Sequence, residues 1–191
     1  MKGFNYSIKF LLAAMMLLAT SIPSICEAST KNKLRQGLFE DVVHFRRTPV
    51  KIGNWQTAPT IVICNESITK LSDVESAIMW WQERGYNLGQ VIVNEPNQIC
   101  HQSGRDGFIT IEGPNTGFDF DYLAITHRKS SQDEILSARI ILRGRSEKIR
   151  ILEHEIGHAL GWSHCNRRGH IMNPEWSRGG WEDTGLTTDE N

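Results

Sequence analysis

The segment that decides the fold is residues 154–164, which read His-Glu-Ile-Gly-His-Ala-Leu-Gly-Trp-Ser-His. His154 and His158 are four residues apart, so on a helix their imidazoles would lie one above the other on one face. The apolar side chains of the segment recur on the opposite face, which predicts a helix with one buried side. Gly161 accepts a left-handed backbone conformation without steric cost, and we expect it to end the helix.

Two imidazoles in this arrangement can share one Zn²⁺, each at about 2.0–2.1 Å. A turn at Gly161 would then bring His164 to the same ion as a third ligand. Three neutral nitrogens leave zinc its double charge and an open fourth position, which is typical of catalytic rather than structural zinc sites. Glu155 follows the first ligand directly, and its carboxylate is expected to act as general base on a zinc-bound water.

At these residues the sequence resembles the metzincin metallopeptidases, whose signature is H-E-x-x-H-x-x-G-x-x-H followed by a methionine turn. The turn candidate is Ile171-Met172-Asn173-Pro174, in which Met172 falls eight residues after His164. This short spacing and the Met-x-Pro ending look most like the matrixin branch. The specific resemblance covers residues 149–174, and the rest of the chain agrees with the family in layout alone.

The resemblance implies an endopeptidase that hydrolyses peptide bonds, with Glu155 as its catalytic general base. It also implies that Met172 forms a hydrophobic base beneath one catalytic zinc ion without binding it. The family fold is a mixed, mainly parallel sheet of about five strands with a backing helix, an active-site helix and a short C-terminal subdomain. The implied zinc ligands are His154, His158 and His164.

The sequence also departs from the matrixin pattern. Cys165 follows the third histidine where matrixins have serine, and no Pro-Arg-Cys-Gly switch precedes the domain. The His-Cys pair, with His170 five residues further on, is similar to archaemetzincins, which bind a second zinc. Their downstream Cys-x-x-Cys is missing here, which argues against a second ion. Few residues follow Met172, so substrate specificity cannot be carried over from the family.

Two other interpretations of the same segment stay open. The chain could be a zinc-binding protein or an amidohydrolase that keeps the metal site but takes a non-generic substrate or partner. It could also be a peptidase dedicated to one protein. The carboxylate of Glu155 favours an enzyme, because a binding module would not need it.

The order of the predicted elements agrees with an α/β (α+β) layout in which helices back one sheet. Leu71, Val74, Ile78 and Trp81 recur at helical spacing, and Ser72 with Glu75 forms a capping-box pair. We expect the strand at 122–126 to be an edge strand that aligns a peptide substrate by strand addition. The predicted strands are 60–64, 88–93, 108–111, 122–126 and 135–142, and the predicted helices are 72–84 and 147–160.

The first residues are typical of a secretory signal peptide. Two lysines and no acidic residue precede an apolar run from Phe10 to Ile22, which is too short for a membrane span of about 20 residues. We therefore predict a signal peptide at 1–28, an arm or short propeptide at 29–53 and a catalytic domain at 54–191. The localisation would be secreted or periplasmic; an uncleaved anchor is the alternative.

Composition and cysteine content narrow the partners. The 191 residues carry a net charge of -1, which argues against a nucleic-acid binder and is compatible with one domain. We expect a monomer that acts on a protein or peptide substrate and has no membrane contact after signal cleavage. Export favours a disulfide. Cys64–Cys100 is the preferred pair, because Cys165 lies beside a candidate metal ligand.

A calcium site is a further candidate. Asn115, Asp119 and Asp121 lie in a Gly/Pro-containing loop and would ligate Ca²⁺ as equivalent loops do in matrixins. Their spacing is not that of an EF-hand, and a solvated turn is the alternative interpretation.

Overall fold

The structure is a computed structural model that describes residues 46–93, 99–100, 104–114, 123–143, 150–175 and 180–188. The predicted signal peptide, the arm up to residue 45 and the predicted calcium ligands lie outside the described residues. Within the described part, neither helix is long and apolar enough to cross a membrane.

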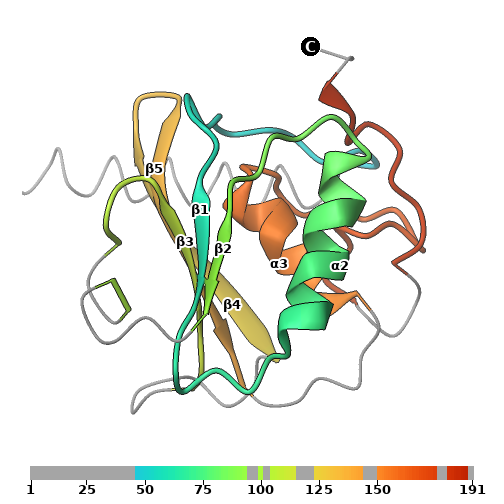
Figure 1. Cartoon of the computed structure of the whole chain (residues 1–191). Helices are drawn as coiled ribbons and strands as arrows, with labels where there is room; N and C mark the ends of the chain where they lie inside the picture. Colours follow the sequence, from blue (N-terminus) through green and yellow to red (C-terminus); the bar gives the residue numbers. More distant parts are fainter. Residues whose placement is uncertain are drawn as a thin grey trace, which may run out of the picture. The chain divides into compact units, whose positions relative to one another are not determined.

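A mostly parallel sheet forms the framework, as Figure 1 shows. The parallel pairs are β1–β2, β1–β3 and β3–β5, and β4 runs antiparallel to β5 at one edge. The α/β prediction is therefore confirmed. In spatial order the five strands are β2 (Val91–Val93), β1 (Thr60–Ile63), β3 (Phe108–Glu112), β5 (Glu134–Leu142) and β4 (Ala124–Ser131).

Helices α2 (Leu71–Gln82) and α3 (Ile151–Ala159) both lie on one face of the sheet (Figure 1). The capping-box prediction is wrong: Lys70 is the N-cap of α2 and makes no side-chain cap bond. Ser72 lies inside the first turn. The predicted start of the second helix at 147 is also wrong, because Arg150 has a left-handed φ of 68° and α3 begins after it.

The largest deviation among the strands is β4. The apolar pattern predicts 122–126, whereas the strand continues to Ser131 and forms a hairpin with β5. The second half of β4 is polar and largely exposed. A strand at the edge of a sheet can have such side chains, because it is not covered on both faces. Residues 127–131 do not have the apolar pattern of a strand, but their backbone pairs with β5, and β4 therefore continues to Ser131.

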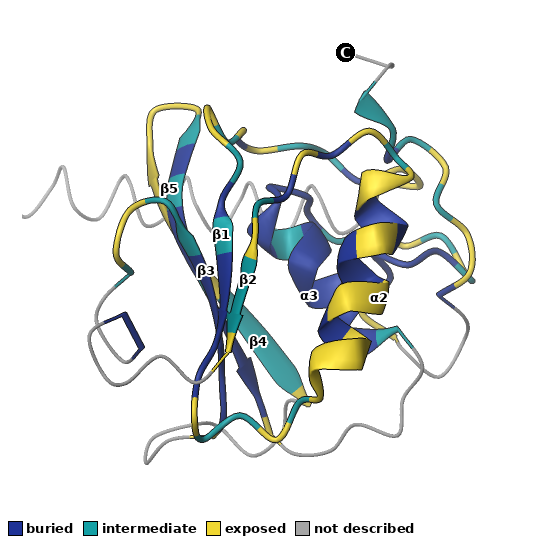
Figure 2. Ribbon diagram, in the orientation of Figure 1, coloured by how far each residue is buried: buried dark blue, intermediate teal, exposed yellow. Residues whose placement is uncertain are grey.

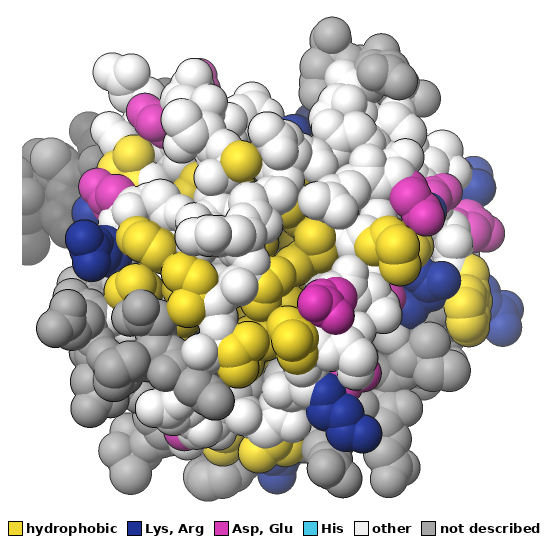
Figure 3. Space-filling model, viewed as in Figure 1, with side chains coloured by type: hydrophobic (Ala, Val, Ile, Leu, Met, Phe, Trp, Pro, Cys, Tyr) yellow, Lys and Arg dark blue, Asp and Glu magenta, His cyan; other side chains and the backbone are white. Residues whose placement is uncertain are grey.

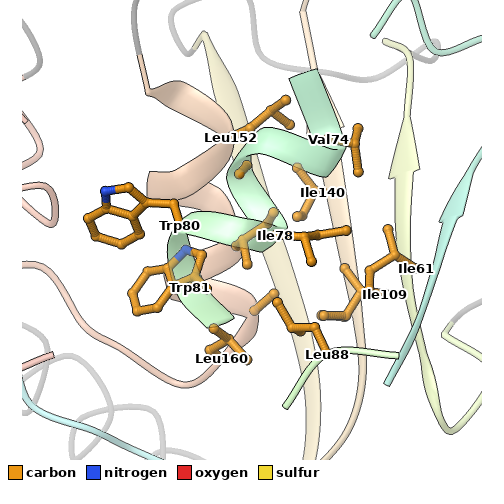
Figure 4. Close-up of a cluster of buried hydrophobic side chains, with 14 of the residues drawn as sticks. Ile61, Val74, Ile78, Trp80, Trp81, Leu88, Ile109, Ile140, Leu152 and Leu160 are labelled. Carbon is orange, nitrogen blue, oxygen red and sulfur yellow. The ribbon is translucent and has the colours of Figure 1, made fainter. Parts of the chain in front are cut away.

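The main core lies between the helices and the sheet, where α2 turns its apolar stripe inward and leaves the opposite side exposed (Figures 2 and 4). Trp81 is fully buried there and donates its indole N–H to the Glu153 carbonyl oxygen at 2.8 Å, which ties α2 to α3. Each fully buried large apolar side chain contributes about 1.5–3 kcal/mol. The labelled members are Ile61, Val74, Ile78, Trp80, Trp81, Leu88, Ile109, Ile140, Leu152 and Leu160.

The outer surface of this helical layer is only partly polar. Met79 on α2 and Trp181 are 57% and 64% exposed. In the view of Figure 3, hydrophobic side chains gather near the middle of the face, and charged side chains lie mostly toward its margin.

A smaller apolar cluster lies on the opposite face of the sheet. It contains Val62 and Cys64, which alternate along the chain with the inward-facing Ile61 and Ile63. Cys64 is bonded to Cys100, so the predicted disulfide is confirmed. The bridge fastens the chain after β2 to the end of β1 and covers this side of the sheet.

Two segments outside the regular elements also pack onto the fold. The chain from residue 46 runs antiparallel to residues 161–166, with Ser163 N–H bonded to the Val50 oxygen at 2.9 Å. Residues 180–188 contact both the predicted methionine turn and the chain just after α2. Ile171 N–H bonds to the Glu182 oxygen, and Thr188 N–H bonds to the Arg84 oxygen.

Replacing Cys64 and Cys100 together by alanine is expected to lower the free energy of unfolding by about 2–4 kcal/mol, because the cross-link restricts the unfolded chain. Urea unfolding measures the change. Cys165→Ala is the matched control, because it removes a buried thiol that is outside the bridge. It should lower the free energy of unfolding by about 1 kcal/mol. A reductant that destabilised the wild type and the double variant equally would contradict the structural role of the bridge.

Candidate metal centre

The three histidines of the 154–164 segment meet at one point in the structure. His154 and His158 project from successive turns of α3, and His164 comes from the chain after the helix. The Nε2 atoms are 3.1 Å apart for His154 and His158, 3.0 Å for His158 and His164, and 3.3 Å for His154 and His164. His154 is buried and the other two are half-buried.

The hydrogen bonds of the first two histidines determine which nitrogen carries the proton. His154 Nδ1 lies 2.6 Å from the Ile171 carbonyl oxygen, and His158 Nδ1 lies 2.8 Å from the Trp162 carbonyl oxygen. Because a carbonyl only accepts, both Nδ1 atoms must be protonated in the neutral rings. Both Nε2 atoms therefore present lone pairs to each other with no proton between them.

Lone pairs that face each other repel. A cation between them would remove this repulsion, because each nitrogen would then bind the cation. Nitrogen ligands about 2.0–2.1 Å from a tetrahedral ion lie about 3.3 Å from each other. The observed separations of 3.0–3.3 Å are close to this value. Histidine ligands commonly donate their second ring N–H to a carbonyl, as His154 and His158 do here. The centre therefore has the donor set and the outer hydrogen bonds of a three-histidine metal site.

Burial supports neutral imidazoles at this centre. It lowers the pKa of His154 to about 4, against the smaller opposing effect of the hydrogen bond to Ile171. Burial also lowers the pKa of His158 well below its usual value, and the neighbouring His154 and His164 lower it further. Neutral rings are the protonation state in which histidine binds metals.

The turn after α3 has the conformation that the sequence predicts. Gly161 has a φ of 104°, and a Cβ atom there would lie 2.3 Å from the Gly53 carbonyl oxygen, so only glycine fits. The N–H groups of Gly161 and Trp162 bond back to the oxygens of His158 and Gly157 at 3.0 and 2.9 Å. These bonds reverse the chain and bring His164 back beside the first two imidazoles.

Met172 is fully buried and packs against α3 at Gly157. A Cβ atom at Gly157 would lie 2.6 Å from Met172 Sδ and 2.8 Å from Trp81 Cζ2. A glycine inside a helix lowers helix stability by about 1 kcal/mol relative to alanine. The close approach of Met172 and Trp81 explains why glycine occurs at position 157. Sequence analysis missed the role of Gly157, although an unexplained helical glycine is a usable signal.

Glu155 follows His154 on α3 and is buried, and its carboxylate has a specific partner on the sheet. Thr126 of β4 donates its hydroxyl to Glu155 Oε2 at 2.6 Å. Burial raises the pKa of Glu155 to about 7, although the Thr126 hydrogen bond acts in the opposite direction. The carboxyl group is therefore oriented and able to exchange a proton near neutral pH.

Arg128 extends the contact between the edge strand and α3. It lies two residues after Thr126 on the same side of β4 and donates from Nη1 to the His158 carbonyl oxygen at 2.7 Å. Neither Thr126 nor Arg128 was predicted as a site residue. Only tertiary pairing of β4 with β5 places them against the helix, and no local pattern signals that contact.

The archaemetzincin-like residues do not join the centre. His170 is buried, accepts the Met172 N–H at Nδ1 (3.0 Å), and contacts the Thr184 carbonyl oxygen through Nε2 (3.1 Å). Both ring nitrogens therefore have partners, Nδ1 in the methionine turn and Nε2 in the 180–188 segment. Cys165 is a free, buried thiol. Among the described residues, the three-histidine group is the one cluster that could hold a metal.

Comparison with known proteins identifies no relative: no family model and no curated protein matches the chain. The evidence for a metal site is therefore the geometry of the described residues.

His164→Ala is expected to weaken Zn²⁺ binding by more than about 100-fold, which exceeds the 10–100-fold effect of losing an outer hydrogen-bond partner. His127→Ala is the matched control and should change the affinity by less than about tenfold, because it removes an exposed histidine that is outside the cluster. Titration against a competing chelator measures both. Equal losses in the two variants would contradict the assigned ligand set.

The stabilising effect of His170 should depend on pH. Burial lowers its pKa below the usual 6.5. The unfolded chain therefore takes up a proton below about pH 6.5 that the folded protein does not yet bind, so stability falls as pH falls. In metal-free protein, the advantage of the wild type over His170→Asn in urea should shrink below pH 6.5, by at most about 1.4 kcal/mol per pH unit. A pH-independent difference would contradict this.

Proposed function

We propose that the protein is a zinc-dependent endopeptidase. The observation that carries the proposal is the convergence of the three histidine Nε2 atoms, together with the buried carboxyl group of Glu155, which follows His154 on α3. A centre that only bound metal would not need an oriented carboxyl group that titrates near neutrality. A metal-binding cluster and an acid–base residue on the same helix favour a hydrolytic enzyme over a binding protein.

Zinc suits the donor set better than harder cations do. Three imidazole nitrogens are typical zinc ligands, whereas magnesium and calcium prefer oxygen. A zinc ion held by three neutral imidazoles supplies Lewis acidity and an open coordination position, the chemistry that such ions bring to hydrolysis.

Glu155 would act as the general base and then as the general acid. Its Oε2 atom is held by the Thr126 hydroxyl, which limits rotation of the carboxyl group. A pKa of about 7 lets the carboxylate accept a proton from water and return it to a leaving amine at neutral pH. Thr126 is therefore a positioning residue, since it acts through Glu155.

The edge strand supports a polypeptide substrate. β4 is the last strand of the sheet, and no described strand pairs with its outer edge. An extended peptide can add to such an edge through backbone hydrogen bonds that do not depend on its sequence. Thr126 and Arg128 hold this strand against α3, so a peptide aligned on β4 would pass close to Glu155.

Glu155→Gln is expected to reduce casein hydrolysis by about a hundred- to ten-thousand-fold, the range for loss of a general base, while bound zinc stays unchanged. Glu153→Gln is the matched control. It makes the same chemical change on the same helix, at a half-buried residue that pairs with Arg150, and should keep activity. Casein cleavage and zinc content are measured for all three proteins.

The outcomes separate the competing functions. Cleavage by the wild type and Glu153→Gln alone would support the endopeptidase. Stoichiometric zinc without cleavage in any protein would favour the zinc-binding protein or the amidohydrolase. Equal activity of Glu155→Gln and the wild type would contradict the role of Glu155.

A further inference from the structure

Two Arg-Arg pairs from distant parts of the sequence lie side by side in the fold. The first is Arg46-Arg47, in the segment before β1, and the second is Arg167-Arg168, in the chain after the third histidine. The hydrogen bond from Asn166 N–H to the Arg46 carbonyl oxygen, at 2.9 Å, joins the two segments. In a chain with a net charge of -1, this gathering of positive charge is local and results from folding.

These segments border an open cavity of about 560 Å³, which is lined by Arg47, Asn166, Arg167 and Arg168. Arg167 pairs with Glu182, with Nε and Oε2 2.5 Å apart. Within the described part of the chain, neither Arg47 nor Arg168 forms an ion pair with an acidic side chain, and both are exposed. Among the described residues, the positive charge at the cavity therefore exceeds the negative charge that pairs with it.

An anion is the chemical complement of this cavity. Guanidinium groups at short range repel one another, and a bound anion turns that repulsion into attraction. Arginine presents a planar fork of donors that fits carboxylate and phosphate oxygens two at a time. A cavity of this volume exceeds one small ion and has room for the carboxylates of a short acidic peptide segment.

The walls of the cavity are fastened to the metal centre. The Arg167 carbonyl oxygen accepts hydrogen bonds from Asn173 Nδ2 at 2.9 Å and from His170 N–H at 3.2 Å, both in the methionine-turn segment. Asn166 lies two residues after His164, so their Cα atoms are at most about 7.6 Å apart. A ligand in the cavity would lie beside the chain that positions the third histidine.

We propose that this arginine-lined cavity binds an anionic group with several oxygens and at least two negative charges, supplied by the acidic side chains of a peptide. The proposal does not depend on peptidase activity. A phosphate-type ion carries the same chemistry and is the alternative source, so the test contains an arm for each.

The experiment is calorimetric titration of the purified, zinc-loaded protein with three probes: a peptide of alternating glutamate and glycine, the same peptide with glutamine for glutamate, and inorganic phosphate. The glutamate peptide should bind, and the glutamine peptide should not. Arg47→Gln and Arg168→Gln should each weaken binding about tenfold or more. Arg105→Gln is the matched control, because it removes one exposed arginine that is not among the cavity residues.

Binding of the glutamate peptide that is lost in the Arg47 and Arg168 variants and retained in Arg105→Gln supports the proposal. Binding of phosphate alone, with the same dependence on the variants, supports the anion cavity but overturns the peptide as its ligand. No binding by either anion, or an equal loss in all three variants, overturns the cavity. Binding that survives both substitutions and disappears on chelation of zinc belongs to the metal centre and also overturns it.

Discussion

The hydrogen bonds from His154 and His158 to the main-chain oxygens of Ile171 and Trp162 are the interactions on which the metal centre depends. They determine where the ring protons lie, and so they leave the Nε2 lone pairs facing each other. Both acceptors lie in the chain after α3, one in the methionine turn and one just beyond Gly161. The conformation of the segment after α3 therefore determines that the two helical histidines can act as a pair of metal ligands.

Contacts with two other parts of the fold support α3. On one side, Gly157 allows Met172 and Trp81 to approach the helix backbone closely, and any larger residue would push them apart. On another side, β4 contacts the helix through Thr126 and Arg128. These contacts fix the position of the helix that carries His154 and His158.

Much of this arrangement could be predicted from the sequence, because the decisive interactions are local. The spacing of His154 and His158 places them on one helical face, and Gly161 marks the turn. The contacts of Thr126 and Arg128 could not be predicted, since they depend on how the folded β4 packs against α3. The start of α3 was also missed, because the left-handed conformation of Arg150 has no local sequence signal.

A histidine cluster that could hold a metal ion occurs here in a chain that matches no family model. The geometry of ligation constrains few positions: the histidines, the glycines at 157 and 161, the acid and the methionine beneath. The sheet imposes a weaker constraint, because strands such as β1 and β3 need only β-branched or apolar residues at alternate positions. Many sequences satisfy that requirement. The chemistry of the site is thus specified by a short segment, while the framework that holds it can vary in most of its residues.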